Sequence, residues 1–289
     1  MSRNTNGEQP PAGEVRIARP RPFLVLCIAG TDSAGCSGIA ADLRTVAALG
    51  GHGLLAVTAV TAQDTREVCA VGAVAPQLVR AQIATAFADP GVDAVKIGML
   101  ANARVVRAVV AALAGRGRSR IVLDPVLSST TGGLLLDVAG QRALVTRLLP
   151  LVDLITPNLP EAQVLLGRPI RGIPGMKAAA HSLLGLGAGA VLIKGGHGRG
   201  EAADVYADAA ETFVLRAPRI ATVHTRGTGC VLSTAGACFL AQNFTLPEAV
   251  RRAKAFVTAA IHCSYPLGRG HGPVNPTAAG HYGAGGRTV

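Results

Sequence analysis

Short apolar runs recur along this chain, and each ends in glycine or polar residues that lead into a helical pattern. The clearest runs cover residues 23–29, 94–100, 121–126, 153–161 and 190–197. Apolar strands that alternate with helices are typical of a parallel sheet joined by right-handed crossovers. The sequence therefore predicts an α/β fold built on a doubly wound, mostly parallel sheet.

The other expected elements fit around these strands. They are helices at about 39–49, 76–88, 231–242 and 247–265, helices opening at Asn102 and ending at Leu166, a strand at 54–59, and a hairpin of 203–206 with 212–215. Residues 1–21 are rich in Pro, Gly, Asn and Arg without periodicity, which predicts a disordered arm. Residues 22–289 are expected to form a single domain, with an ordered loop at 268–273 and fraying beyond Pro276.

A glycine-rich turn, residues 225–230, runs directly into a helix of small apolar residues. Gly227 and Gly229 let the backbone approach a ligand, and the free N–H groups at the helix start favour an anion such as phosphate. We call residues 227–230 the anion turn. Cys230 lies in the first helical turn, where the thiolate is expected to be favoured and the thiol pKa lowered. The same pattern also fits an ordinary helix start with a buried cysteine.

Polar and sulfur-bearing side chains follow many of the predicted strands or open the next helix. They are Asp42, Gln63, Met99, Asp124, Asn158, Glu161, Lys194 and Cys230. Ligands of doubly wound sheets bind beyond the carboxyl ends of the strands. A single polar strand end is usually a turn or a cap, whereas this many on one edge predict a ligand site.

Other classes of protein fit the sequence less well. The net charge of +11 permits nucleic-acid binding, but the arginines are scattered and aromatic residues make up only 3%, so no nucleic-acid partner is expected. No apolar run approaches the roughly 18 residues of a membrane span, and the first residues carry no apolar signal core. Without C-x-x-C spacing the cysteines are expected to be reduced, and the protein to be cytoplasmic. The first glycine loop, residues 30–38, matches neither the dinucleotide-binding nor the P-loop spacing.

From Phe23 to about Pro276 the chain resembles the ribokinase superfamily, and within it the hydroxymethylpyrimidine and phosphomethylpyrimidine kinases of thiamine biosynthesis. The resemblance lies in the order and spacing of AGTDSAGCSGIAADLRT, VTAVTAQDT, KIGML, VLDPV, ITPNLPEA, VLIKGGH, RGTGC and GRGHGPVNP. It implies a three-layer α/β/α sandwich and the use of ATP and Mg²⁺. It also implies two successive substrates, an aminopyrimidine alcohol and then its monophosphate. A homodimer is the oligomer that the resemblance suggests.

The resemblance also implies roles for individual residues. Those expected to bind the pyrimidine are Gly30, Asp42, Gln63 and Met99. The residues expected to hold the transferred phosphoryl group are Gly227, Thr228, Gly229 and Cys230, with Cys230 as the base toward the hydroxymethyl oxygen. Those expected near the nucleotide are Asn158, Lys194 and Thr225, and those expected to hold magnesium are Glu161 and Asp124.

Several residues depart from the usual pattern of this family. They are Cys36, Ser37, Ala40, Asp64, Arg226 (where His is frequent) and the segment 127–131. Because these positions touch the expected substrate pocket, two alternatives stay open. One is a pyridoxal-type kinase on the same scaffold, and the other is a catalytically weak relative that only binds its ligand.

Overall fold

The fold was analysed in a computed structural model, which describes residues 21–115, 117, 119–128, 133–196 and 202–283. The arm predicted for residues 1–21 therefore lies outside the described residues, apart from Arg21.

The described residues form a nine-stranded sheet in the order β3-β2-β1-β4-β5-β6-β7-β8-β9. The strands are β1 Leu24–Gly30, β2 His52–Gln63, β3 Val68–Ala73, β4 Ala94–Ile97, β5 Arg120–Leu123, β6 Leu154–Ile155, β7 Ala190–Ile193, β8 Ala202–Asp208 and β9 Thr212–Ala217. Strands β2, β1, β4, β5, β6 and β7 run parallel, whereas β3, β8 and β9 join as antiparallel neighbours. The mostly parallel sheet predicted from the sequence is confirmed.

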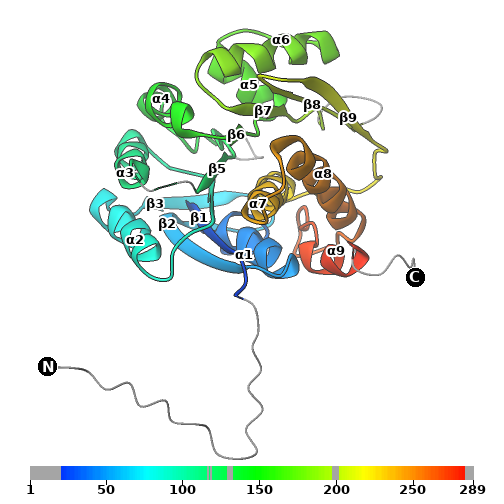
Figure 1. Cartoon of the computed structure of the whole chain (residues 1–289). Helices are drawn as coiled ribbons and strands as arrows, with labels where there is room; N and C mark the ends of the chain where they lie inside the picture. Colours follow the sequence, from blue (N-terminus) through cyan, green and yellow to red (C-terminus); the bar gives the residue numbers. More distant parts are fainter. Residues whose placement is uncertain (1–20, 116, 118, 129–132, 197–201, 284–289) are drawn as a thin grey trace, which may run out of the picture.

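Helices cover both faces of this sheet (Figure 1). The helices are α1 Gly38–Ala48, α2 Pro76–Ala88, α3 Ala103–Leu113, α4 Val138–Ala143, α5 Leu159–Leu166, α6 Gly172–Gly185, α7 Thr228–Ala241, α8 Leu246–His262 and α9 Pro276–Gly283. Helices α2 to α6 lie on one side, and α1, α7, α8 and α9 lie on the other. The result is the three-layer α/β/α sandwich that the resemblance implied.

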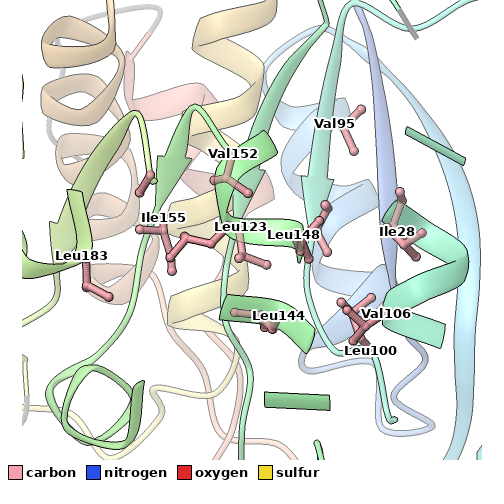
Figure 2. Close-up of a cluster of buried hydrophobic side chains, with 14 of the residues drawn as sticks. Ile28, Val95, Leu100, Val106, Leu123, Leu144, Leu148, Val152, Ile155 and Leu183 are labelled. Carbon is pink, nitrogen blue, oxygen red and sulfur yellow. The ribbon is translucent and has the colours of Figure 1, made fainter. Parts of the chain in front are cut away.

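Each face of the sheet has its own apolar core, because successive strand residues point to opposite faces. In β1, Leu26 and Ile28 belong to the cluster beneath α2, α3 and α6, whereas Val25 and Cys27 belong to the cluster beneath α7 and α8. Figure 2 shows the first cluster, in which Ile28 and Leu123 of the sheet lie among helical side chains. Full burial of one such aliphatic side chain contributes about 1.5–3 kcal/mol, so the two cores fix the sheet between its helices.

The structure adds elements that the sequence pattern did not show. Strand β2 continues past Ala59 to Gln63 and turns back as β3, whose side chains are largely exposed and so lack an apolar alternation. Helices α4 and α6 were also not expected. Within the described part of the chain, no helix is long and apolar enough to cross a membrane.

The predicted fraying beyond Pro276 is wrong as far as Gly283, because α9 extends to that residue, and residues 284–289 lie outside the described part of the chain. Asn275 stabilises its first turn, since the Asn275 side-chain oxygen accepts a hydrogen bond from the Ala278 N–H at 3.2 Å. Ala279 is buried and packs into the core beneath α7 and α8.

Candidate active site

A cavity of about 530 Å³ opens at the carboxyl edge of the parallel strands. It brings together all of the predicted site residues except Asp42. They are Gly30, Gln63, Met99, Asp124, Asn158, Glu161, Lys194, Thr225, Gly227, Thr228, Gly229 and Cys230. Convergence of residues from so many separate strand ends makes this cavity the candidate active site.

The anion turn has the geometry expected for it. Gly227 caps the amino end of α7 with a φ of 80°, a left-handed conformation that favours glycine. The Thr228 hydroxyl donates to the Thr225 carbonyl at 2.7 Å, which closes the turn. A Cβ added at Gly229 would lie 3.2 Å from both Asp124 Oδ2 and Lys194 Nζ. The first amides of α7 therefore lie beside a carboxylate and an ammonium at the cavity wall.

Replacing Gly227 by alanine should lower the free energy of unfolding. A left-handed backbone conformation costs a residue with a Cβ about 1–2 kcal/mol, and we expect the loss to be clearly larger than this. The reason is that a Cβ at residue 227 would overlap the Cys36 backbone carbonyl, whereas a Cβ at Gly167, also left-handed at 63°, meets open space. Urea denaturation of Gly227→Ala beside the matched control Gly167→Ala measures the difference. Equal losses in the two variants would show that the contact with Cys36 carries no cost.

Lys194 and Asp124 form an ion pair on the wall of the cavity. Lys194 Nζ lies 2.7 Å from Asp124 Oδ1, and the Lys194 backbone N–H donates to the Pro157 carbonyl at 2.8 Å. The carboxylate follows β5 and the ammonium follows β7, so the pair spans β6 at the edge where parallel strands end. Burial works against the charged form of Lys194, but the Asp124 and Glu161 carboxylates outweigh it and hold the pKa of Lys194 above its ordinary value.

Asn158 and Glu161 open α5 as a capping box. Asn158 Oδ1 accepts from the Glu161 N–H at 2.8 Å, and Glu161 Oε2 accepts from the Asn158 N–H at 2.8 Å. Burial, together with the Asp124 carboxylate, raises the pKa of Glu161 to about 7 despite the opposing Lys194 ammonium. Glu161 is thus a carboxyl group whose charge costs free energy in this site until a cation compensates it.

The donors at this edge fit a magnesium ion bound mainly through phosphate oxygens and water. No group of three or more His, Cys, Asp or Glu side chains able to hold a metal occurs among the described residues. The cavity does offer two hard carboxylates, Asp124 and Glu161. Mg²⁺ is usually held by one or two carboxylates plus substrate phosphates, and a closed protein cage is not needed.

Asp42 does not reach the cavity as the resemblance implied. Its carboxylate is fully buried and accepts from Lys96 Nζ at 2.9 and 2.8 Å and from the Thr234 hydroxyl at 2.8 Å. Lys96 lines the cavity instead. Sequence reasoning missed Lys96, although a lysine inside the buried strand β4 is a signal in itself, because lysine is almost never fully buried without a partner. Asp42 therefore holds the Lys96 ammonium and the Thr234 hydroxyl in place, and does not itself line the cavity.

The predicted lowering of the Cys230 pKa is wrong for the ligand-free chain. Burial and the Asp42 and Asp124 carboxylates raise the pKa of the Cys230 thiol to about 11. The Lys96 ammonium and the Gly38 amide act in the opposite direction and do not compensate. The helix start thus provides a thiol that is mostly protonated at neutral pH.

The first glycine loop also lines the cavity, next to the anion turn. A Cβ at Gly30 would lie 3.1 Å from Met99 Sδ, so glycine keeps the floor of the expected pyrimidine pocket open. Ser37, one of the unusual residues, donates its hydroxyl to Asp32 at 2.7 Å. Cys36 is buried, and burial raises the pKa of its thiol, which agrees with a small packing residue in the loop.

Comparison with known protein families and relatives agrees with this geometry. Residues 32–275 match the family described as phosphomethylpyrimidine kinase. A hydroxymethylpyrimidine/phosphomethylpyrimidine kinase of Streptomyces coelicolor is 46% identical over 254 residues, which is 88% of this chain and 94% of that protein. The thiamine biosynthesis bifunctional protein ThiED of Geobacter sulfurreducens is 46% identical over 261 residues, covering 89% of this chain. The match covers only 53% of that longer protein.

Solved structures share the fold. The ADP complex of a pyridoxal kinase from Bacillus subtilis superposes with a TM-score of 0.83 at 34% identity. The match covers 89% of this chain and 98% of that one. Solved kinases named for two different substrates, pyridoxal and phosphomethylpyrimidine, thus share this fold.

Proposed function

The chain belongs to the phosphomethylpyrimidine kinase family, and from this we propose that it phosphorylates an aminopyrimidine alcohol and then its monophosphate, using ATP, in thiamine biosynthesis. The alcohol is 4-amino-5-hydroxymethyl-2-methylpyrimidine. The observation that carries the proposal is one cavity lined by the anion turn, by Gly30, Gln63 and Met99, and by the Lys194–Asp124 pair. We propose that residues 22–289 act as one kinase domain.

In this proposal, different residues of the cavity bind the acceptor, bind the transferred phosphoryl group and accept the proton. Gly30, Gln63 and Met99 hold the pyrimidine ring, and the amides of the anion turn hold the phosphoryl group as charge develops on its oxygens. Cys230 first loses its own proton to solvent, and the resulting thiolate accepts the proton of the hydroxymethyl oxygen as that oxygen bonds to the transferred phosphoryl group and ADP leaves. The raised pKa of Cys230 makes the thiolate a strong proton acceptor once it forms. The Lys96 ammonium favours that ionisation.

Asn158, Lys194 and Thr225 bind the nucleotide side of the reaction. The Lys194 ammonium stabilises the phosphate oxygens electrostatically, and Asn158 fixes the start of α5 beside them. Glu161 and Asp124 would hold Mg²⁺, which neutralises phosphate charge when it is bound. Because ATP and reduced thiols are both found in the cytoplasm, we propose that compartment. A homodimer stays a prediction.

Exchange of Glu161 for glutamine should raise the Mg²⁺ concentration for half-maximal rate by about 10-fold or more, since losing a metal-supporting carboxylate typically costs 10- to 100-fold in metal affinity. Glutamine keeps an oxygen that can accept the Asn158 N–H, so α5 should stay capped. The measurement is initial rate against free Mg²⁺ at saturating ATP. An unchanged magnesium curve would remove Glu161 from this role.

The test of function is incubation of the purified protein with magnesium-ATP and one acceptor at a time. The acceptors are the aminopyrimidine alcohol, its monophosphate and pyridoxal, with products followed by mass spectrometry. Formation of both the pyrimidine monophosphate and diphosphate is the expected result. Pyridoxal phosphate as the sole product would favour the pyridoxal kinase alternative, which the similarity to the Bacillus subtilis enzyme motivates. Binding of the alcohol without any product would indicate a ligand-binding relative.

A further inference from the structure

Arg226, the residue before the anion turn, carries a buried guanidinium to the wall of the active-site cavity. Only 7% of the residue is exposed, and it lines the cavity. Its backbone is fixed by strand-like pairing, since the Arg226 N–H donates to the Gly272 carbonyl at 3.2 Å and its carbonyl accepts from the Val274 N–H at 3.0 Å. The fold therefore sets the backbone position of Arg226.

The Arg226 guanidinium pairs with a carboxylate of the first glycine loop, a loop to which a second arginine also binds. Asp32 Oδ2 lies 3.5 Å from Arg226 Nη2, but the same carboxylate also accepts hydrogen bonds from the Ala34 and Ser37 amides and from the Ser37 hydroxyl. Arg44 adds a second guanidinium, which donates to the Gly35 carbonyl. After burial, which raises the pKa of the Cys36 thiol most, the Asp32 carboxylate raises that pKa further and the Arg226 and Arg44 guanidinium groups lower it. The Asp32 carboxylate that pairs with Arg226 is thus already engaged by three other hydrogen-bond donors.

The Arg226 guanidinium keeps donors for a ligand. Among the described residues, the guanidinium makes its polar contact with Asp32, through Nη2 at one end of the planar group. Arginine presents several N–H donors in a geometry that matches phosphate oxygens. A buried fork at a cavity wall, directly before an anion-binding turn, is suited to a phosphate group.

We propose that Arg226 binds the phosphate of the pyrimidine monophosphate and so favours the second phosphorylation over the first. This inference rests on the proposed function. The first acceptor is a neutral alcohol, whereas the second carries a charge of about −1.5 to −2. In the second step the attacking atom is an oxygen of the acceptor's own phosphate. The phosphate of the pyrimidine monophosphate must therefore lie between the ring and the anion turn, beside residue 226.

The structure favours the acceptor phosphate over the phosphates of ATP as the ligand of Arg226. Arg226 pairs with Asp32, in the loop that follows β1 on the pyrimidine side of the cavity. Gly227 likewise packs against the Cys36 carbonyl of that loop. Lys194, the residue expected beside the nucleotide phosphates, instead pairs with Asp124 after β5.

The test is R226Q, assayed with each pyrimidine acceptor separately and, without ATP, by calorimetric binding of the alcohol and of the monophosphate. We expect KM and Kd for the monophosphate to rise about 10- to 100-fold, as for loss of a charge-assisted hydrogen bond. Values for the alcohol and KM for ATP should change less than about 3-fold. R226K, which keeps the charge and loses the fork, should fall between R226Q and the unchanged protein.

The matched control is R44Q, which removes a charge from the same cluster but no donor from the cavity wall. It should leave the preference for the monophosphate near that of the unchanged protein. Equal losses for both acceptors in R226Q, a rise confined to KM for ATP, or no change would each overturn the proposal. Because Kd is measured without turnover, it tests whether Arg226 binds the monophosphate even if the protein phosphorylates neither acceptor. Circular dichroism of R226Q and R226K checks that each variant is folded.

Discussion

Replacement of Lys96 by methionine is expected to lower the free energy of unfolding by about 3–5 kcal/mol, the usual result of removing one partner from a buried ion pair. Lys96 and Asp42 are both 0% exposed at their side chains and lie 2.8 Å apart. Without the ammonium, the Asp42 carboxylate keeps only the Thr234 hydroxyl and must be protonated or left charged in an apolar interior. Urea denaturation at neutral pH measures the loss.

Two further variants show whether the loss comes from charge burial. In the double variant with Asp42→Asn, neither charge remains, and much of the lost stability should return. Arg120→Met breaks a comparable but exposed pair, Arg120–Asp153 at 2.9 Å, and should cost less than about 1 kcal/mol. A loss in Lys96→Met no larger than in Arg120→Met would refute the account of the buried pair.

Exchange of Cys230 for serine should lower kcat by about 10²- to 10⁴-fold, the range for loss of a general base, while KM for ATP stays nearly constant. Serine keeps the size of the side chain but ionises much less readily than a thiol. Cys230 lines the cavity at the amino end of α7, and in the proposed function it contacts the acceptor and not the nucleotide. Steady-state kinetics with each acceptor measure the effect, and near-normal turnover would exclude Cys230 as the base.

The thiol can also be followed without turnover. Since the pKa of Cys230 is about 11 in the ligand-free protein, its alkylation rate should rise about tenfold per pH unit through pH 8–10. Peptide mass spectrometry separates this site from the other cysteines. Cys263→Ser, at the end of α8 and outside the lining of the cavity, serves as the control and should leave both kcat and this profile unchanged.

Much of the fold was predictable because several of the parallel strands are buried on both faces and so appear as unbroken apolar runs, as in residues 24–30 and 190–193. Strand β3 was missed for the opposite reason, since most of its side chains face solvent. The C-terminal helix was missed because its first turn depends on the Asn275 cap and on burial of Ala279, and both need the rest of the fold.

The part of the candidate site that could be predicted from the sequence is the anion turn, where the position of the backbone matters more than any side chain. Gly227 and Gly229 could be placed from the pattern alone, because only a turn at a helix start needs glycine at that spacing. The state of Cys230 was not predictable, since its pKa depends on carboxylates from α1 and from the segment after β5. The sequence separates Asp42 from Lys96 by 54 positions, so their pairing could not be seen in it.

The backbone pairing of Arg226 with residues 272–274 sets the order in which this protein can become active during synthesis. One wall of the site comes from the loop after β1, near residue 30, whereas the turn before α7 is held by Gly272 and Val274. A nascent chain that has released β1 to α8 still lacks the segment that fixes this turn. Ribosome-bound chains of increasing length should therefore gain ligand binding abruptly once residues 272–274 have emerged, long after the central sheet has formed.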